Sequence, residues 1–481
     1  YSSDTTWGTS GSPYTVTGNI LVDSGVTLTI EAGVVIKLQN NVGIVVNGTL
    51  IANGNETNRI IFTSDIADPQ PGDWANIKFT SSAIPSSWDI SENYSSGSYI
   101  NYCDFKYAGN SSIYSEVSVF IHNSTFINNK NWGEYRDGVY QSGSQFYYAG
   151  GAITTKNGYS LIKKCFFYGN SSNNGYNHGF GGAIYSMGSK ISNSVFVLNT
   201  AIGSGEGGAI FAKSNTQISD CNFIDNKAEY NGNSIGSNGV CLVSNSTFQS
   251  SNSSGYGLIS NYVSGSITLN NSNIYSDENY IFYNRNSNAT DLKNNYWGES
   301  ISDSIDDKIF DFYDQSSLGV VSYTPILMTP DTTAPISPPS NVTKSVSGSD
   351  VVLNWSANGE SDIAGYKLYY GTPTGYSYVT IVDIGNVTTY TVTGGDIATE
   401  YAITAYDSDK DDDGDDMVDG NESWFSVSKE LKVTLSSSAT SISEPTNSAT
   451  LTATLDNTSS ADVVVNLTYT GTATNATDYS G

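Results

Sequence analysis

The feature that most constrains this chain is a phrase that recurs along its middle third. The phrase opens with Gly-Gly-Ala-Ile and closes with Phe-x-x-Asn, and it is complete in residues 150–170, 181–199 and 207–226. A weaker copy occupies residues 232–248. A unit of this length cannot bury its own apolar face, whereas stacked copies share one continuous core. The repeat therefore predicts a stacked, repetitive architecture.

The pattern inside each copy indicates short β-strands. Apolar and polar residues alternate over four or five positions and then break at Gly or Asn, which is typical of strands. Several short strands per repeat indicate a parallel β-helix, whose coils lie about 4.8 Å apart. We predict an all-β chain, with a right-handed parallel β-helix of about ten coils over residues 1–328, followed by β-sandwich modules.

The recurring residues predict packing rather than chemistry. The Gly pair permits a positive φ or a close backbone approach at a coil corner. We expect the Ile and Phe of each copy to point inward and stack on their counterparts, and the closing Asn to adopt a left-handed turn and join a hydrogen-bonded ladder. These residues are Ile153, Ile184, Ile210 and Ile235; Phe167, Phe196, Phe223 and Phe248; and Asn129, Asn170, Asn199 and Asn226.

One inward position, shortly before the closing Phe, holds only small side chains. In coil order its occupants are Cys103, Ser124, Cys165, Ser194, Cys221 and Ser246. Cysteines at this position are two coils apart, or about 9.6 Å, whereas a disulfide needs α-carbons within about 7 Å. We predict that the cysteines are buried free thiols.

The charge balance limits the classes of partner. The chain has 47 acidic and 20 basic residues and a formal net charge of -27, which disfavours nucleic acid and anionic membranes. The same balance suits cations such as calcium. No apolar run is long enough to predict a membrane-spanning helix. The chain begins at Tyr1 rather than Met, as a processed secreted protein would. We therefore predict a secreted, cell-surface protein with no nucleic-acid partner and no membrane span.

Several phrases resemble known β-helix families. The phrases at residues 28–38, 43–54, 60–65 and 72–79 resemble the opening coils of secreted bacterial and archaeal β-helix proteins. The middle repeats resemble those of chlamydial polymorphic outer-membrane proteins and archaeal adhesin-like proteins, and residues 294–298 resemble a closing coil. The resemblance covers residues 10–300 and implies the fold. It does not select a function, because this scaffold serves adhesins, lyases and structural proteins alike.

Two long excursions interrupt the repeats at residues 80–98 and 130–149, and both are rich in Tyr, Trp and Ser. Loops outside a solenoid are a common place for a binding face. Alternatively, these excursions cover a face or an edge of the β-helix. The sequence leaves both interpretations open.

The C-terminal third changes pattern. Residues 329–339 are rich in Pro and Thr and read as a linker. The alternating strands of residues 340–434 resemble a fibronectin type III domain, in which Trp355 matches the core Trp and Tyr401 the tyrosine corner. Residues 435–481 resemble the first half of a Calx-beta domain. Half a sandwich leaves strand edges unpaired, so either the sequence is cut short or another chain supplies the missing strands.

One acidic segment has ligand spacing. Its Asp-x-Asp-x-Asp-Gly run opens like an EF-hand loop, although the twelfth position is Gly420 rather than Glu. We predict that calcium binds here; the alternative is a solvated acidic loop. The predicted ligands are Asp407, Asp409, Asp411, Asp413, Asp415 and Asp419.

Catalytic signals are weak. The chain has only two histidines, His122 and His178, and no nucleophile motif, so we predict no catalytic residue and no other cofactor site. The predicted function is an extracellular structural or adhesive surface protein that self-assembles into a filament or layer, with other copies, surface proteins or glycans as partners. The alternative is a carbohydrate-binding or polysaccharide-degrading β-helix protein, either a lyase or a glycoside hydrolase, that uses the aromatic excursions.

Overall fold

The structure is a computed structural model of the chain, and its contacts divide the chain into two compact units. The first unit comprises residues 1–337, 359–362 and 407–423, and the second comprises residues 338–358, 363–406 and 424–481. The residues that the structure describes are 1–132, 135–136, 139–140, 149–173, 179–251, 257–262, 264–298, 302–371, 378–408, 416–430, 433–439 and 449–455.

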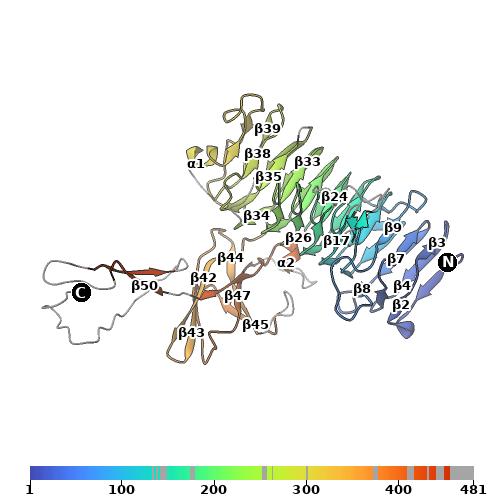
Figure 1. Ribbon diagram of the computed structural model, residues 1–481, viewed down its shortest axis with the longest axis horizontal. Coiled ribbons are helices and arrows are strands. Elements are labelled where there is room, and N and C mark those ends of the chain that lie inside the picture. Colours follow the sequence, from blue (N-terminus) through green and yellow to red (C-terminus); the bar gives the residue numbers. More distant parts are fainter. Residues whose placement is uncertain are drawn as a thin grey trace. The chain divides into compact units, whose positions relative to one another are not determined.

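The first unit is a parallel β-helix, which confirms the predicted fold class. Its strands stack from the N-terminus onward in three long sheets (Figure 1). Each of the first ten coils contributes one strand to each sheet, so the strand order in each sheet at first advances in steps of three. Within the described residues, neighbouring strands of these three sheets pair in parallel, as in β4 (Thr27–Ile30) and β7 (Thr49–Asn53).

The first sheet contains twelve strands. In order they are β1 (Thr5–Trp7), β4, β7, β12 (Tyr99–Asn101), β15 (Phe120–His122), β21 (Ser160–Lys163), β25 (Ser189–Ser192), β29 (Thr216–Ser219), β33 (Val240–Ser244), β36 (Ser266–Asn270), β39 (Thr290–Asp291) and β41 (Val321–Ser322).

The second sheet contains ten strands. They are β2 (Tyr14–Val16), β5 (Val35–Leu38), β8 (Ile60–Ser64), β13 (Cys103–Lys106), β16 (Thr125–Ile127), β22 (Phe166–Tyr168), β26 (Val195–Val197), β30 (Asn222–Ile224), β34 (Thr247–Ser250) and β37 (Asn273–Ser276).

The third sheet contains eleven strands. They are β3 (Ile20–Val22), β6 (Ile44–Val46), β9 (Ile77–Phe79), β14 (Ile113–Ser115), β20 (Ile153–Thr155), β24 (Ile184–Ser186), β28 (Ile210–Ala212), β32 (Ile235–Ser237), β35 (Ile259–Asn261), β38 (Phe282–Tyr283) and β40 (Ile309–Phe310).

A smaller corner sheet follows the second sheet in four coils. Its strands are β17 (Lys130–Asn131), β23 (Ser171–Ser172), β27 (Thr200–Ala201) and β31 (Lys227–Ala228). In the part of the chain that the structure describes, helical structure is limited to the 3₁₀ turn Thr9–Gly11 and the helices α1 (Ser302–Asp306) and α2 (Asp416–Asp419). Among the described residues, no helix has the length and apolar character needed to cross a bilayer.

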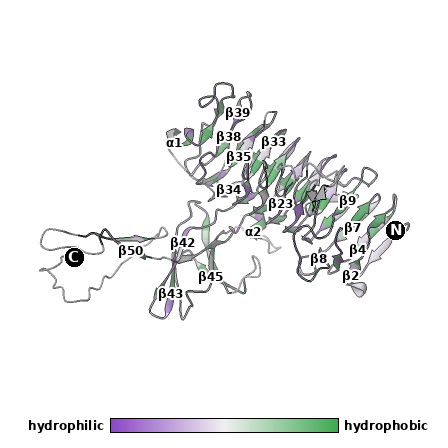
Figure 2. Cartoon of the chain, viewed as in Figure 1, coloured by the Kyte–Doolittle hydropathy of each residue, from purple (hydrophilic) through white to green (hydrophobic). Residues whose placement is uncertain are grey.

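Stacked phenylalanines form the centre of the β-helix, as the repeat predicted. Neighbouring ring centroids lie between 4.6 and 5.0 Å apart, with nearly parallel planes. Figure 2 shows apolar residues along the strands of this unit. The rings belong to Phe62, Phe105, Phe126, Phe167, Phe196, Phe223 and Phe248, and each is fully buried. The predicted isoleucines are also in register and fully buried.

The asparagine ladder is confirmed, but its left-handed position is not where the sequence placed it. The amide Nδ2 of Asn170 donates to Oδ1 of Asn199 at 2.9 Å, and Asn199 repeats this bond to Asn226. The positive φ belongs to the residue before each ladder Asn. Those residues are Asn128, Gly169, Leu198 and Asp225, with φ of 53°, 62°, 55° and 47°. The ladder side chain can then turn inward, because the preceding residue makes the bend.

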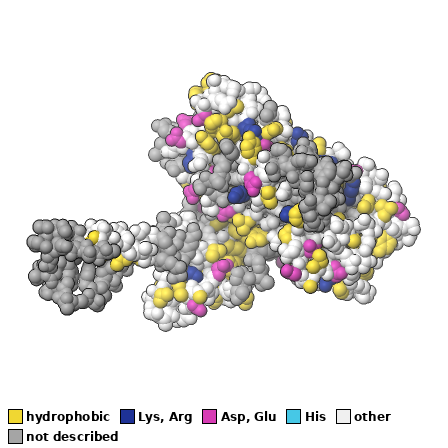
Figure 3. Space-filling model, viewed as in Figure 1, with side chains coloured by type: hydrophobic (Ala, Val, Ile, Leu, Met, Phe, Trp, Pro, Cys, Tyr) yellow, Lys and Arg dark blue, Asp and Glu magenta, His cyan; other side chains and the backbone are white. Residues whose placement is uncertain are grey.

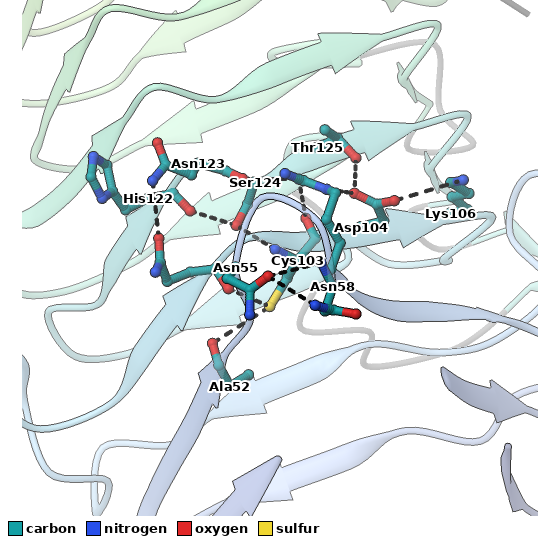
Figure 4. Close-up of polar contacts among 12 residues, drawn as sticks. Ala52, Asn55, Asn58, Cys103, Asp104, Lys106, His122, Asn123, Ser124 and Thr125 are labelled. Atoms are coloured by element: carbon teal, nitrogen blue, oxygen red, sulfur yellow. Dashed lines mark hydrogen bonds and ion pairs between the residues drawn. The ribbon is translucent and has the colours of Figure 1, made fainter. Parts of the chain in front are cut away.

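The four cysteines are buried free thiols. The serine that follows a cysteine at this position has a direct structural role, which Figure 4 shows around Cys103. The backbone N–H of Cys103 donates to Oγ of Ser124 in the next coil at 3.1 Å, and its thiol donates to the carbonyl of Ala52 at 3.5 Å. Cys165 and Cys221 repeat the first contact with the serines that follow them.

Residues 331–337, within the predicted linker 329–339, pack on the second sheet. Asn273 exchanges two hydrogen bonds with the backbone of Asp331, at 2.8 and 2.7 Å. The hydroxyl of Thr247 donates to the carbonyl of Pro335, and Ile336 is buried. This segment is therefore an ordered part of the first unit.

The second unit contains a sandwich-like pair of four-stranded sheets. One consists of β46 (Thr389–Val392), β43 (Asp350–Ser356), β42 (Ser340–Ser347) and β49 (Lys429–Glu430), and the other of β45 (Thr380–Gly385), β44 (Ile363–Tyr370), β47 (Tyr401–Asp407) and β48 (Ser426–Val427). Trp355 and Tyr401 are buried, and the hydroxyl of Tyr401 donates to the carbonyl of Asp396 at 3.1 Å. These features fit a sandwich, while its family assignment stays a prediction.

The last described strands are β50 (Val433–Ser437) and β51 (Leu451–Leu455), an antiparallel pair whose residues are all exposed. The rest of the predicted Calx-beta region, residues 440–448 and 456–481, lies outside the described residues. That assignment also stays a prediction.

Candidate functional site

The structure describes only two of the six predicted calcium ligands. Asp409, Asp411, Asp413 and Asp415 lie outside the described residues, and Asp407 is buried at the end of β47. The residues that are described contain no group of three or more His, Cys, Asp or Glu side chains that would hold a metal ion. The calcium site stays a prediction.

Asp419 has a partner that the sequence did not suggest. Its Oδ2 lies 2.9 Å from Nζ of Lys164, and its side chain is only 9% exposed. This ion pair joins α2 to the β-helix within the first unit. A cation that used Asp419 would compete with the Lys164 ammonium for this oxygen.

The first excursion, residues 80–98, folds onto the β-helix. It forms an antiparallel hairpin of β10 (Ser87–Trp88) and β11 (Tyr94–Ser96). Tyr94 stacks on Tyr99 at 4.4 Å, and Trp88 lies 6.0 Å from Phe120, where both partners belong to the first sheet. These contacts support the interpretation that this excursion covers a face of the β-helix.

Ion pairs fasten the tip of this hairpin. Glu92 bonds to Lys163, at 3.2 Å, and to Lys190, so it bridges strands β21 and β25 of successive coils. Burial opposes ionisation of Glu92, but the hydrogen bonds from Lys190 and Lys163 outweigh it, so that the pKa of Glu92 lies below its ordinary value. The negative charge of Glu92 is thus paired with two lysines of the β-helix.

The second excursion contributes to a pocket of about 400 Å³ at the corner that follows the second sheet. The pocket is lined by Asn40, residues 70–73, Lys130, Trp132 and Ser171. These residues come from four different coils, which the fold brings together at one corner. Figure 3 shows one face of the molecule, on which charged side chains are scattered among hydrophobic and other ones.

Backbone hydrogen bonds between coils hold the pocket walls. The N–H of Asn41 donates to the carbonyl of Asp73 at 3.0 Å, and the N–H of Lys130 donates to the carbonyl of Ala108 at 2.8 Å. The carboxylate of Asp73 accepts the N–H of Gln70 at 2.9 Å, which closes the turn. The lining residues are therefore positioned by the coil ladder itself.

Trp132 is the largest group in the pocket. Nζ of Lys130 lies 3.6 Å from the centroid of its ring, a close cation–π contact. The indole edge lies against Gly72, whose φ is 101°; a Cβ at that residue would approach Nε1 of Trp132 to 2.0 Å. Gly72 is therefore required for the present position of the ring.

The indole N–H of Trp132 is buried and has no hydrogen-bond partner among the described residues. A buried donor without a partner costs free energy, about 1–3 kcal/mol. Uncompensated donors are uncommon in folded proteins. The pocket thus combines a flat apolar ring, an ammonium, one carboxylate, two amides and a hydroxyl.

A second polar cluster is satisfied internally. The guanidinium of Arg285 lies between the rings of Tyr230 and Tyr262, at 4.9 and 4.7 Å, and donates to Glu206 at 2.9 Å. Burial raises the pKa of Glu206, and the nearby Arg285 charge opposes this rise. The charges of this cluster are paired with one another, so we assign the cluster a role in the stability of the fold.

The sequence identified the second excursion as a possible binding face but not the pocket. Trp132 and Lys130 belong to that excursion. Gly72 and Asp73, in contrast, begin residues 72–79, whose resemblance to other β-helix proteins indicated only the fold. His122 lies in β15, with its ring 6.0 Å from that of Phe120, and His178 lies outside the described residues. None of the Ile, Phe and Asn residues that recur in the repeats lines the pocket.

Comparisons with known proteins support the fold of the N-terminal part. Residues 1–115 match the model of a family described as a pectate-lyase-like β-helix domain. The match includes Asn40 and residues 70–73 of the pocket wall and ends before Lys130 and Trp132. The search of curated proteins gave no match.

Proposed function

We propose that this protein binds a polysaccharide through the corner pocket. The observation that carries the proposal is a pocket in which the aromatic ring of Trp132 lies together with Lys130, Asp73 and two amide side chains. A sugar ring offers an apolar C–H face to an aromatic ring, and its hydroxyls exchange hydrogen bonds with amides and carboxylates. A few such polar groups around an apolar surface are typical of small-ligand sites.

The pocket favours binding over cleavage. Glycoside hydrolysis usually requires two carboxyl groups about 5 to 9.5 Å apart, and the lining residues that the structure describes include one, Asp73. The match to a pectate-lyase-like domain supports a polysaccharide ligand and also makes cleavage the outcome to test first.

A second function, as a structural or adhesive rod, is favoured by a different observation. The phenylalanine stack runs without interruption from Phe62 to Phe248, so the β-helix is a continuous scaffold. A secreted, cell-surface location, calcium binding by the acidic segment 407–419 and self-association are part of this proposal. The two functions are compatible, because a rod can present a glycan-binding face.

The test is a binding measurement with polygalacturonate and with a neutral polysaccharide, by calorimetry. We expect Trp132→Ala to weaken binding by at least about tenfold, or about 1.4 kcal/mol, because the stacking surface is lost. Tyr313→Ala is the matched control, since Tyr313 is 83% exposed and outside the pocket. Equal affinity of wild type and Trp132→Ala would refute the proposal. Chain shortening during incubation would show that the protein is an enzyme.

A further inference from the structure

The corner sheet aligns four outward side chains in a row. Its strands pair in register, so that Lys130 faces Ser171, Ser171 faces Thr200, and Thr200 faces Lys227. The following residue of each strand points inward and is buried. Lys130, Ser171 and Thr200 are partly exposed and Lys227 is exposed, so the row forms a strip on the outside of the β-helix.

The row is held rigidly, because each member directly follows a residue of the asparagine ladder. The backbone N–H groups of Ser171, Thr200 and Lys227 donate to the ladder residue of the preceding coil, at 2.9, 2.8 and 2.8 Å. The ladder side chains are fully or almost fully buried. The spacing of the row is therefore the spacing of the coils.

The row begins inside the pocket. Lys130 and Ser171 both line the pocket, and Thr200 and Lys227 continue the same line over the next two coils. Three coil steps of about 4.8 Å give the row a length of about 14 Å. A ligand that touches Trp132 and also Lys227 must be extended and must run parallel to the helix axis.

We propose that the ligand is a linear saccharide chain that lies along the corner row, with one end in the pocket. This inference rests on the proposed function and adds the direction and minimum length of the ligand. Ser171 and Thr200 supply hydroxyls that both donate and accept hydrogen bonds, which suits sugar hydroxyls. Lysines at both ends of the row favour a chain that carries carboxylates, because charge-assisted hydrogen bonds are the stronger ones.

The experiment compares two oligogalacturonides, a disaccharide and one several times longer, by calorimetry with the full chain. We expect the longer chain to bind more tightly to wild type. Lys227→Gln should weaken binding of the longer chain about fivefold and leave the disaccharide unchanged, because Lys227 lies two coils beyond the pocket wall. Thr200→Ala should act in the same direction. Lys293→Gln is the matched control, since it removes the same charge from a side chain that is 41% exposed and lies just after β39 in the first sheet.

The outcomes separate this inference from the proposed function. If Trp132→Ala weakens both oligosaccharides while Lys227→Gln and Thr200→Ala change neither, the pocket binds sugar but the chain does not follow the row, and the inference is wrong. If Trp132→Ala changes neither oligosaccharide, the proposed function itself is wrong. Equal affinity of wild type for both lengths would also overturn the inference.

Discussion

Phe167 and Phe196 lie in successive coils with ring centroids 4.6 Å apart and planes only 1° apart. Both rings are completely buried. Phe196 also stacks on Phe223 at 5.0 Å, so each inner ring of the stack has a partner on both faces. Loss of one ring removes two aromatic contacts and leaves a cavity in the centre of the β-helix.

Phe196→Ala should lower the free energy of unfolding by about 3–5 kcal/mol, the usual range for a buried Phe. Denaturant unfolding followed by circular dichroism measures the change. Phe312→Ala is the control, because Phe312 is 41% exposed, and it should stay within about 0.5 kcal/mol of wild type. A cost near that of the control would show that the stack does not stabilise the core.

Asn199→Ala should destabilise the β-helix by about 1–3 kcal/mol for each buried polar group that loses its partner. Oδ1 of Asn199 accepts both the side-chain and the backbone N–H of Asn170, and its amide donates to the carbonyl of Phe167. Hydrogen exchange should quicken at the corner sheet first. Asn215→Ala, at an exposed residue, serves as the comparison. Similar free energies of unfolding for the two variants would contradict a stabilising role of the asparagine ladder.

The four cysteines should not react with a thiol reagent at pH 8 while the protein is folded. Burial raises the pKa of Cys165 and of Cys241 to about 12, so neither forms the reactive thiolate at that pH. Denatured protein is the control and should react with four equivalents of the thiol reagent, one for each cysteine. Rapid reaction of the native protein would mean that the β-helix opens at these coils.

Glu278 should make the protein less stable as the pH rises above the ordinary carboxyl range. Burial raises the pKa of Glu278, so the folded state retains a proton that the unfolded state has already released, and stability falls with rising pH. One carboxyl oxygen accepts from Asn233 and Ser250, at 2.6 and 2.8 Å, and the other is buried without a partner among the described residues.

Glu278→Gln removes this titration and should gain stability relative to wild type at pH 7 but not at pH 4. Unfolding free energies of both proteins across this range measure the difference. The exposed Glu56→Gln is the control for loss of a negative charge. A difference in unfolding free energy between wild type and variant that does not change with pH would contradict the raised pKa of Glu278.

The parts of the fold that could be predicted are those in which stacking requires the same residue in every coil. Phe196, Ile184 and Asn199 repeat because each must match the coil above and below it. The left-handed bend could not be located in this way. It occurs at Asn128, Gly169, Leu198 and Asp225. Asn, Gly and Asp favour a positive φ, but Leu does not, and the ladder Asn that follows each of these residues is an equally suitable candidate.

The candidate site was only partly predictable. The sequence identified the excursion that contains Trp132, but the pocket also needs Asn40 and Gly72 from earlier coils. Nothing repeats among these residues, because each supplies a different wall. The ion pair between Lys164 and Asp419 joins residues 255 positions apart, and neither residue belongs to a pattern that would reveal the other.

The hairpin of residues 87–96 also implies an order of events during synthesis. Glu92 leaves the ribosome long before its partners, since Lys163 and Lys190 follow it by 71 and 98 residues. The ion pairs at its tip cannot form until both later coils have been made. A nascent chain stopped before Lys163 would hold the hairpin only through its contacts with earlier strands, such as those of Tyr94 with Tyr99 and of Trp88 with Phe120.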